Sequence, residues 1–179
     1  MEDAAINLLR LSTPRMLLRP WQMADWPMFH RIWGDPRVIW WADAHGAHIS
    51  QARLGTILRQ CATMPPGLGW WAALPAEGSG VLGGFILRPA PYDDSVELGY
   101  HLAHAAWGRG LATEGAAALL RHGFATLALP RITAVVHADN APSHAVVKRL
   151  GMRALGPMAF HGLPHVKYAL NHAEAAAYL

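Results

Sequence analysis

A glycine-rich turn is the segment of this sequence best suited by residue type to hold a ligand. Gly108 and Gly110 flank Arg109, directly before an alanine-rich stretch from about Leu111 to Leu127 with apolar residues at helical intervals. Glycines let a backbone approach a ligand closely, and the N–H groups at the start of a helix attract anions, phosphate above all. The pattern indicates a diphosphate site, although a Gly-x-Gly taken alone also fits a simple tight turn.

A second polar segment lies before a shorter predicted helix over Pro142–Leu150. Asn140 stands three residues before Ser143, the spacing at which an N-cap side chain accepts a hydrogen bond from the backbone of the helix. Gly151 follows the helix and is expected in the left-handed conformation that ends many helices. Helix capping is therefore a sufficient role for Asn140.

Four ordered segments resemble the GNAT superfamily of acyl-CoA-dependent N-acetyltransferases, and in particular its RimJ/RimL-like branch of ribosomal-protein N-terminal acetyltransferases. They are Arg15–Trp21, Glu97–Tyr100, Trp107–Glu114, and His137–Ser143 leading to Lys148–Met152. The resemblance covers nearly the whole chain. The superfamily's pyrophosphate motif generally begins with Gln or Arg, whereas Trp107 takes that position here. A tryptophan at this position agrees with the branch. It puts in question a contact of the side chain at 107 with the pyrophosphate, but not the contacts of the backbone groups that follow.

The resemblance implies acetyl-CoA as cosubstrate. Strand residues would pair through their main chains with the pantetheine arm, which requires no particular side chains. The turn would hold the pyrophosphate, and Ser143 would point towards the thioester sulfur. A solvated surface role stays open for Arg109 and for Lys148. The implied cofactor-binding residues are Tyr100, His101, Leu102, Trp107, Gly108, Arg109, Gly110, Leu111, Ala112, Thr113, Asn140, Ser143 and Lys148.

The implied reaction needs an amine that has lost its proton, and amines have pKa values near 8 at an N-terminus and about 10.4 in lysine. Glu97 is the acidic residue of the predicted strand, so we expect it to accept that proton directly or through water. The alternative for Glu97 is a pair with a neighbouring arginine. Ser143 or Tyr100 would protonate the departing thiolate. We expect direct attack on acetyl-CoA, with Cys61 a core residue rather than an acetyl carrier.

The amine acceptor is less well defined. Trp40, Trp41 and Trp71 belong to two tryptophan pairs and are expected to line the acceptor site, with core packing as the alternative. The acceptor would be the N-terminal amine of a protein, such as a ribosomal protein. A small amine, such as an amino acid, a polyamine or an antibiotic, is the competing class. A non-catalytic acyl-CoA-binding module is a third interpretation.

The predicted elements indicate one α/β (α+β) domain of GNAT type over residues 1–179, with a cofactor-binding core at about 95–151. We expect a mixed, mostly antiparallel, twisted sheet of about six or seven strands flanked by helices. Helices are predicted after Asp25 and after Ser50, besides the two already named. The predicted strands are 16–20, 70–74, 81–87, 95–102, 132–136, 152–155 and 166–170.

Composition excludes several other classes. With 53% hydrophobic and 15% charged residues in 179, the chain can bury a core, which argues against disorder. The formal charge is only +3 and its arginines are scattered, which argues against nucleic-acid binding. No apolar stretch is long enough for a membrane helix, and the acidic start at Met1-Glu2-Asp3 is unlike a secretory signal. We therefore expect a cytoplasmic protein with no membrane association.

Neither a disulfide nor a metal is expected. The chain has a single cysteine, which suits a reducing compartment. Its 11 histidines include close pairs but no His-Glu-x-x-His pattern, so we predict no metal site. The sequence leaves open whether the protein is a monomer or a homodimer.

Overall fold

A computed structural model describes residues 10–40 and 46–179 of the chain. Its strands form a mixed sheet with the order β1-β2-β3-β4-β5-β6-β8-β7. The strands are β1 (Leu11–Ser12), β2 (Met16–Pro20), β3 (Gly69–Pro75), β4 (Gly83–Pro89), β5 (Val96–Leu102), β6 (Arg131–His137), β7 (Arg153–Phe160) and β8 (Leu163–Asn171). Strands β5 and β6 are parallel, while β1–β2, β2–β3, β6–β8 and β7–β8 are antiparallel.

The predicted α/β class and mixed, mostly antiparallel sheet are therefore confirmed. The sheet has eight strands in the described residues, one more than the upper predicted number. The additional strand is β1, whose two residues are too few to show an alternating pattern. The last two strands are also longer than predicted, because their hairpin continues to Phe160 and Leu163.

Four α-helices accompany the sheet in the described part of the chain: α1 (Trp26–Trp33), α2 (Ala47–Cys61), α3 (Leu111–Arg121) and α4 (Ala141–Arg149). Helix α2 begins before Ser50 rather than after it. Ser50 does not cap this helix, since it is buried with its hydroxyl 3.0 Å from Nδ1 of His30 on α1. The predicted helix to Leu127 instead ends at Arg121 and is followed by a π-helical turn, His122–Thr126.

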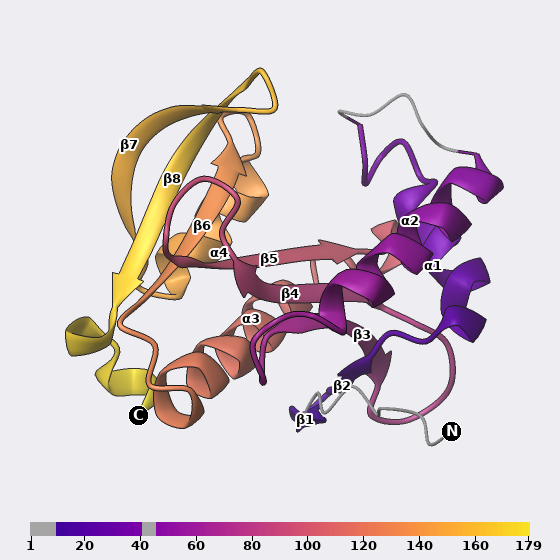
Figure 1. Ribbon diagram of the computed structural model, residues 1–179, viewed down its shortest axis with the longest axis horizontal. Helices are drawn as coiled ribbons and strands as arrows, with labels where there is room; N and C mark the ends of the chain where they lie inside the picture. Colours follow the sequence, from indigo (N-terminus) through magenta and orange to yellow (C-terminus); the bar gives the residue numbers. More distant parts are fainter. Residues whose placement is uncertain (1–9, 41–45) are drawn as a thin grey trace. The chain divides into compact units, whose positions relative to one another are not determined.

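The described chain divides into two compact units. The first contains the residues up to Ile86 together with Tyr100–Leu111. Its core is aromatic: Phe29 and Trp33 stack at 4.1 Å, and Trp21 meets Phe29 edge-on at 5.3 Å. Cys61 is buried in the same core, as predicted, and burial raises the pKa of its thiol. Figure 1 shows α1 and α2 of this unit next to each other.

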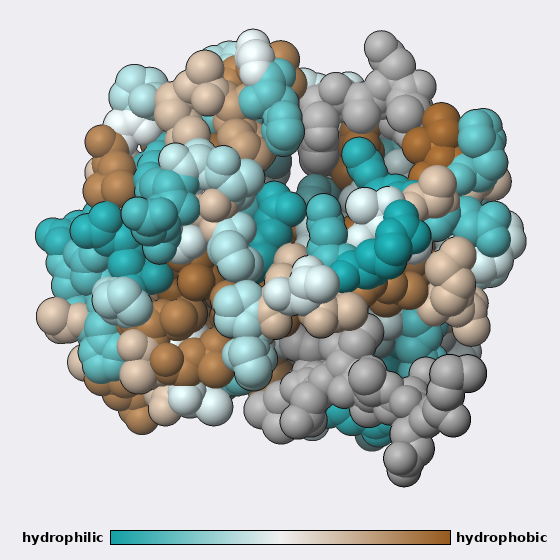
Figure 2. Space-filling view, in the orientation of Figure 1, coloured by the Kyte–Doolittle hydropathy of each residue, from teal (hydrophilic) through white to brown (hydrophobic). Residues whose placement is uncertain are grey.

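The second unit contains Leu87–Gly99 and Ala112–Leu179. Strand β6 pairs with β8 along its whole length, and β8 forms a long curved hairpin with β7 (Figure 1). The π-helical turn packs tightly on β6, because a Cβ added at Gly123 would lie 2.5 Å from Cδ1 of Ile132. In β7, exposed and half-buried residues alternate from Leu155 to Phe160, and hydrophilic and hydrophobic residues lie side by side on the face of this unit in Figure 2.

Candidate active site

Strand β5 carries the first part of the predicted site. Its register with β6 covers only Val96↔Ile132 and Glu97↔Thr133, and β5 then continues to Leu102. The ladder with β6 thus ends at Glu97, three residues before the predicted pantetheine contacts begin at Tyr100. Tyr100 is half-buried with its ring 6.2 Å from that of Phe85, and the ring of His101 lies 5.1 Å from that of Trp33.

The turn after β5 has the conformation that its glycines predict. Gly108 and Gly110 have φ values of +71° and +75°, in the left-handed region that side chains other than glycine rarely adopt. A Cβ added at Gly108 would meet no atom within 4 Å. Helix α3 begins directly after Gly110, so its first N–H groups follow the turn without interruption. Open space, two permissive backbones and a helix start together fit a diphosphate.

The side chain of Trp107 has a local role at the start of this turn. Its Nε1 donates a hydrogen bond to the carbonyl of Leu102 at 2.9 Å, and its ring lies 4.9 Å from that of His104. The indole thus joins the end of β5 to the turn. This use of Trp107 explains why a residue other than Gln or Arg can open the turn without disturbing its backbone.

Arg15 also reaches the turn, although we did not expect it among the site residues. Its Nη1 donates a hydrogen bond to the carbonyl of Arg109 at 2.8 Å, across 94 residues of sequence. The sequence offered one indication of a role for Arg15, which is that it begins the first segment that carries the family resemblance. Arg19 in the same segment has a different task, since it binds both oxygens of Asp25 at 2.6 and 2.8 Å.

The start of α4 matches its prediction. Asn140 is the N-cap, and its Oδ1 accepts a hydrogen bond from the N–H of Ser143 at 3.1 Å. Gly151 ends the helix with φ +80°. Ser143 is half-buried, and Lys148 is exposed on the last turn of the helix. Capping therefore accounts for Asn140, and the implied contacts of Ser143 and Lys148 with acetyl-CoA stay predictions.

Glu97 is buried on β5 and forms an ion pair with Arg88 of β4. Oε2 of Glu97 lies 3.0 Å from both Nε and Nη2 of Arg88. Burial raises the pKa of Glu97, while the charges of Arg88 and His161 oppose that rise. The arginine partner that we considered as the alternative is thus present, and the carboxyl group is also a stronger base than an exposed one.

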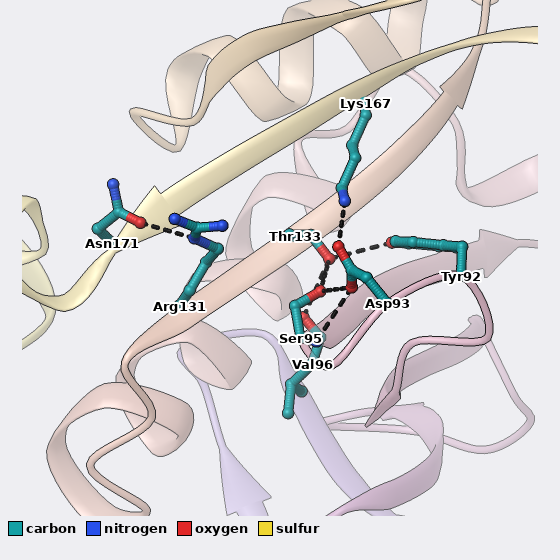
Figure 3. A network of polar contacts seen from close by, with 8 residues as sticks. All are labelled: Tyr92, Asp93, Ser95, Val96, Arg131, Thr133, Lys167 and Asn171. Carbon is teal, nitrogen blue, oxygen red and sulfur yellow. Dashed lines mark hydrogen bonds and ion pairs between the residues drawn. The ribbon is translucent and has the colours of Figure 1, made fainter. Parts of the chain in front are cut away.

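A polar network lies at the beginning of β5 (Figure 3). Its centre is Thr133 of β6, which is fully buried and pairs with Glu97 in the sheet register. Oγ1 of Thr133 lies 2.8 Å from Oγ of Ser95 and 3.0 Å from the hydroxyl of Tyr92. Asp93 accepts a hydrogen bond from Oγ of Ser95 at 2.5 Å and forms an ion pair with Lys167.

The carboxylate of Asp93 indicates which hydroxyl donates each hydrogen bond of this network. An ionised carboxylate only accepts, so the Ser95 hydroxyl donates to Asp93. Ser95 then accepts from Thr133, whose single proton is shared with the carbonyl of Val96 at 3.3 Å, and Thr133 accepts from Tyr92. The pKa of Asp93 falls to about 2, because hydrogen bonds from Lys167 and Ser95 outweigh its desolvation. The network fastens the segment before β5 to β6 and β8, and thereby fixes the strand at Glu97.

The remaining predicted residues have mixed placements. Trp40 is 49% exposed, whereas Trp71 is fully buried. Trp71 therefore serves the core and has no surface to offer an acceptor. Trp41 lies outside the described residues. Leu102 and Leu111 are buried, and Ala112 and Thr113 are half-buried on the first turn of α3, while Arg109 is exposed.

Neither a metal nor a membrane span is evident in the described ranges, 10–40 and 46–179. No three or more His, Cys, Asp or Glu side chains gather there in a way that could hold a metal ion. None of the helices there is long and apolar enough to cross a membrane.

Comparisons with known proteins place this geometry in context. FsC-acetyl coenzyme A-N(2)-transacetylase of Aspergillus fumigatus is 34% identical over 124 residues, which are 65% of this chain and 47% of the fungal protein. The matched segment thus spans about half the length of that relative. The crystal structure of an acetyltransferase from Agrobacterium tumefaciens superposes with a TM-score of 0.78 at 26% identity, covering 96% of this chain and 99% of that one.

RimJ of Mycobacterium smegmatis, solved in complex with CoA-disulfide, has the same fold, with a TM-score of 0.73 at 22% identity over 96% of this chain and 92% of its own. The family description of the acetyltransferase (GNAT) domain matches residues 15–153, which include every element described above from Arg15 to the start of β7. The resemblance to the GNAT superfamily seen in the sequence is thereby confirmed, and the chain belongs to the GNAT family of N-acetyltransferases.

Proposed function

We propose that this N-acetyltransferase moves an acetyl group from acetyl-CoA to a primary amine by direct attack. The observation that carries the proposal is the left-handed turn at Gly108 and Gly110, open on one side and followed directly by α3. Acetyl-CoA supplies an acetyl thioester, whose thiolate is a tolerable leaving group. We take residues 1–179 as one catalytic domain, with the cofactor-binding core at about 95–151.

In this proposal Glu97 takes the proton from the attacking amine, directly or through one water. Arg88 occupies Oε2, whereas Oε1 accepts no hydrogen bond within the described part of the chain. The ion pair therefore orients the carboxylate and leaves one oxygen for the proton. As the N–C bond forms, an N–H group near His101 or Leu102 stabilises the oxyanion. As the C–S bond breaks, Ser143 or Tyr100 protonates the thiolate, unless it leaves ionised.

The backbone and polar groups of three segments would hold the cosubstrate. Main-chain groups of Tyr100, His101 and Leu102 extend along the pantetheine, and the turn from Trp107 to Thr113 holds the pyrophosphate. The guanidinium of Arg109 offers a positive charge to the phosphates. Its side chain is exposed and makes no ion pair with a described residue, so this charge is not already neutralised. Asn140, Ser143 and Lys148 at α4 complete the proposed set.

The acceptor class divides this proposal into two candidates. The first is the N-terminal amine of a protein, such as a ribosomal protein, with the exposed indole of Trp40 as one wall of its site. The second is a small amine, such as an amino acid, a polyamine or an antibiotic. The second is kept because the fungal relative is named for acetyl transfer to N(2) of FsC. The cytoplasm is the proposed compartment, since a lone buried thiol suits a reducing environment.

Release of free CoA from acetyl-CoA tests the proposal. The assay is run on short peptides with varied N-termini, on the same peptides with blocked N-termini, and on a panel of small amines. Turnover that disappears when the N-terminus is blocked supports the first candidate, and turnover of small amines supports the second. Saturable acetyl-CoA binding without turnover on any acceptor would favour a non-catalytic acyl-CoA-binding module.

A further inference from the structure

The main chain of Arg15 is held firmly where it enters β2. The carbonyl of Arg15 accepts a hydrogen bond from the N–H of Ala76 at 2.9 Å. One residue later Met16 pairs with Pro75 of β3, and its N–H donates to Oγ1 of Thr13 at 2.9 Å. The backbone position from which the Arg15 side chain extends is therefore fixed by the sheet. Only the side chain has to be ordered when it contacts another segment.

That side chain covers one side of the glycine turn. Nη1 of Arg15 donates to the carbonyl of Arg109 at 2.8 Å, and Nη2 lies 3.5 Å from where a Cβ of Gly110 would stand. The position of a Cβ at Gly108 is open by contrast. The guanidinium thus lies against the turn at residues 109 and 110, and the turn stays accessible at Gly108.

The contact sets the direction of a backbone N–H. In a trans peptide the carbonyl oxygen of one residue and the N–H of the next point to opposite sides of the bond. Holding the carbonyl of Arg109 against Arg15 therefore directs the N–H of Gly110 away from Arg15. Gly110, whose N–H belongs to this peptide, adopts many backbone conformations at little cost, as does Gly108 before Arg109, so the turn by itself does not select this orientation.

We infer that Arg15 is a positioning residue for the diphosphate of acetyl-CoA. By fixing the carbonyl of Arg109, it directs the Gly110 N–H towards the anion, next to the first N–H groups of α3. Arg15 acts through the backbone, and the side chain of Arg109 supplies charge. This inference rests on the proposed function, because that function places the diphosphate at the turn. Arg19 serves as a contrast, since its ion pair with Asp25 stabilises the fold.

Isothermal titration of the whole protein with coenzyme A fragments tests this role without any measurement of turnover. Arg15→Met removes the donor and the charge, whereas Arg15→Lys keeps a charged N–H donor on a side chain of similar length. With Arg15→Met we expect coenzyme A and dephospho-CoA to bind roughly tenfold more weakly, and with Arg15→Lys within about threefold of wild type. Pantetheine, titrated by NMR because it binds weakly without phosphates, should bind all three proteins equally.

A matched control is Arg53→Met, which removes one exposed arginine from α2 and should leave all three affinities unchanged. Wild-type affinity of Arg15→Met for coenzyme A would overturn this inference alone. Equal losses in Arg15→Lys and Arg15→Met would also overturn it, because an N–H donor at this position would then make no difference to coenzyme A binding. Wild-type protein that binds none of the three compounds would overturn the proposed function and this inference with it.

Discussion

Arg88 binds Glu97 through a single carboxylate oxygen. Its Nε and Nη2 both lie 3.0 Å from Oε2, and Oε1 receives no hydrogen bond from residues 10–40 or 46–179. A pair that used both oxygens would engage one lone pair on each, whereas here both lone pairs of Oε1 stay available. The arrangement found here holds a buried carboxylate in place and keeps one oxygen for another partner, so the ion pair and a role as base are compatible.

Replacing Glu97 with Gln should slow acetyl transfer about a hundredfold or more, since an amide cannot take the proton of the amine. Coenzyme A affinity should stay at the wild-type value, because the proposed cosubstrate contacts begin after Glu97 on β5. Steady-state rates combined with calorimetric titration separate these two effects. An unchanged rate across pH would remove Glu97 from the mechanism.

Removing Arg88 should shift the pH dependence of the reaction. Burial already raises the pKa of Glu97 above 4.5, and the positive charge of Arg88 opposes this rise. In Arg88→Gln the opposing charge is lost, the pKa rises further, and the base becomes protonated at a higher pH. The acidic limb of kcat/KM should therefore move to higher pH, with a larger loss of rate at pH 6 than at pH 8. A limb that stays in place would show that Glu97 does not control it.

Local sequence patterns predicted the local features of this protein, but they did not predict which residues far apart in the sequence contact each other. The bounds of β2, the cap at Asn140 and the left-handed Gly151 follow from residues within one turn or strand. The contact from Arg15 to Arg109 depends on where two segments 94 residues apart come to lie, which no short pattern encodes. Likewise, an arginine partner for Glu97 was foreseeable as a type, but its identity as Arg88 depends on strand order.

Thr133→Val should destabilise the protein by about 1–3 kcal/mol, because the half-buried hydroxyls of Tyr92 and Ser95 lose their common partner. Chemical denaturation measures this loss. Thr133→Ser is the matched control, since it keeps the hydroxyl and should recover most of the stability. Equal stability of the valine variant and the wild type would show that the network in Figure 3 does not hold the start of β5.

The ion pair between Asp93 and Lys167 should make stability depend on pH in the acidic range. The folded-state pKa of Asp93 is about 2, below the ordinary 3.8. A lowered carboxyl pKa contributes stability that is fully present above 3.8 and is lost as pH falls towards 2. Unfolding midpoints should therefore fall less steeply between pH 5 and pH 2 in Asp93→Asn than in wild type. Parallel curves would mean that the carboxylate adds nothing to stability.

A left-handed glycine at the turn can be compared with one elsewhere in the chain. Gly108 and Gly151 have φ values of +71° and +80°, and neither has an atom within 4 Å of an added Cβ. Alanine at either position should cost about 1–2 kcal/mol of stability, because the backbone conformation disfavours any side chain. Only Gly108→Ala should also weaken coenzyme A binding, since its methyl group projects into the open side of the turn. Unfolding curves establish that the two variants are equally strained, and titration with coenzyme A then isolates the effect on binding. Equal affinities in both variants would place the diphosphate away from Gly108.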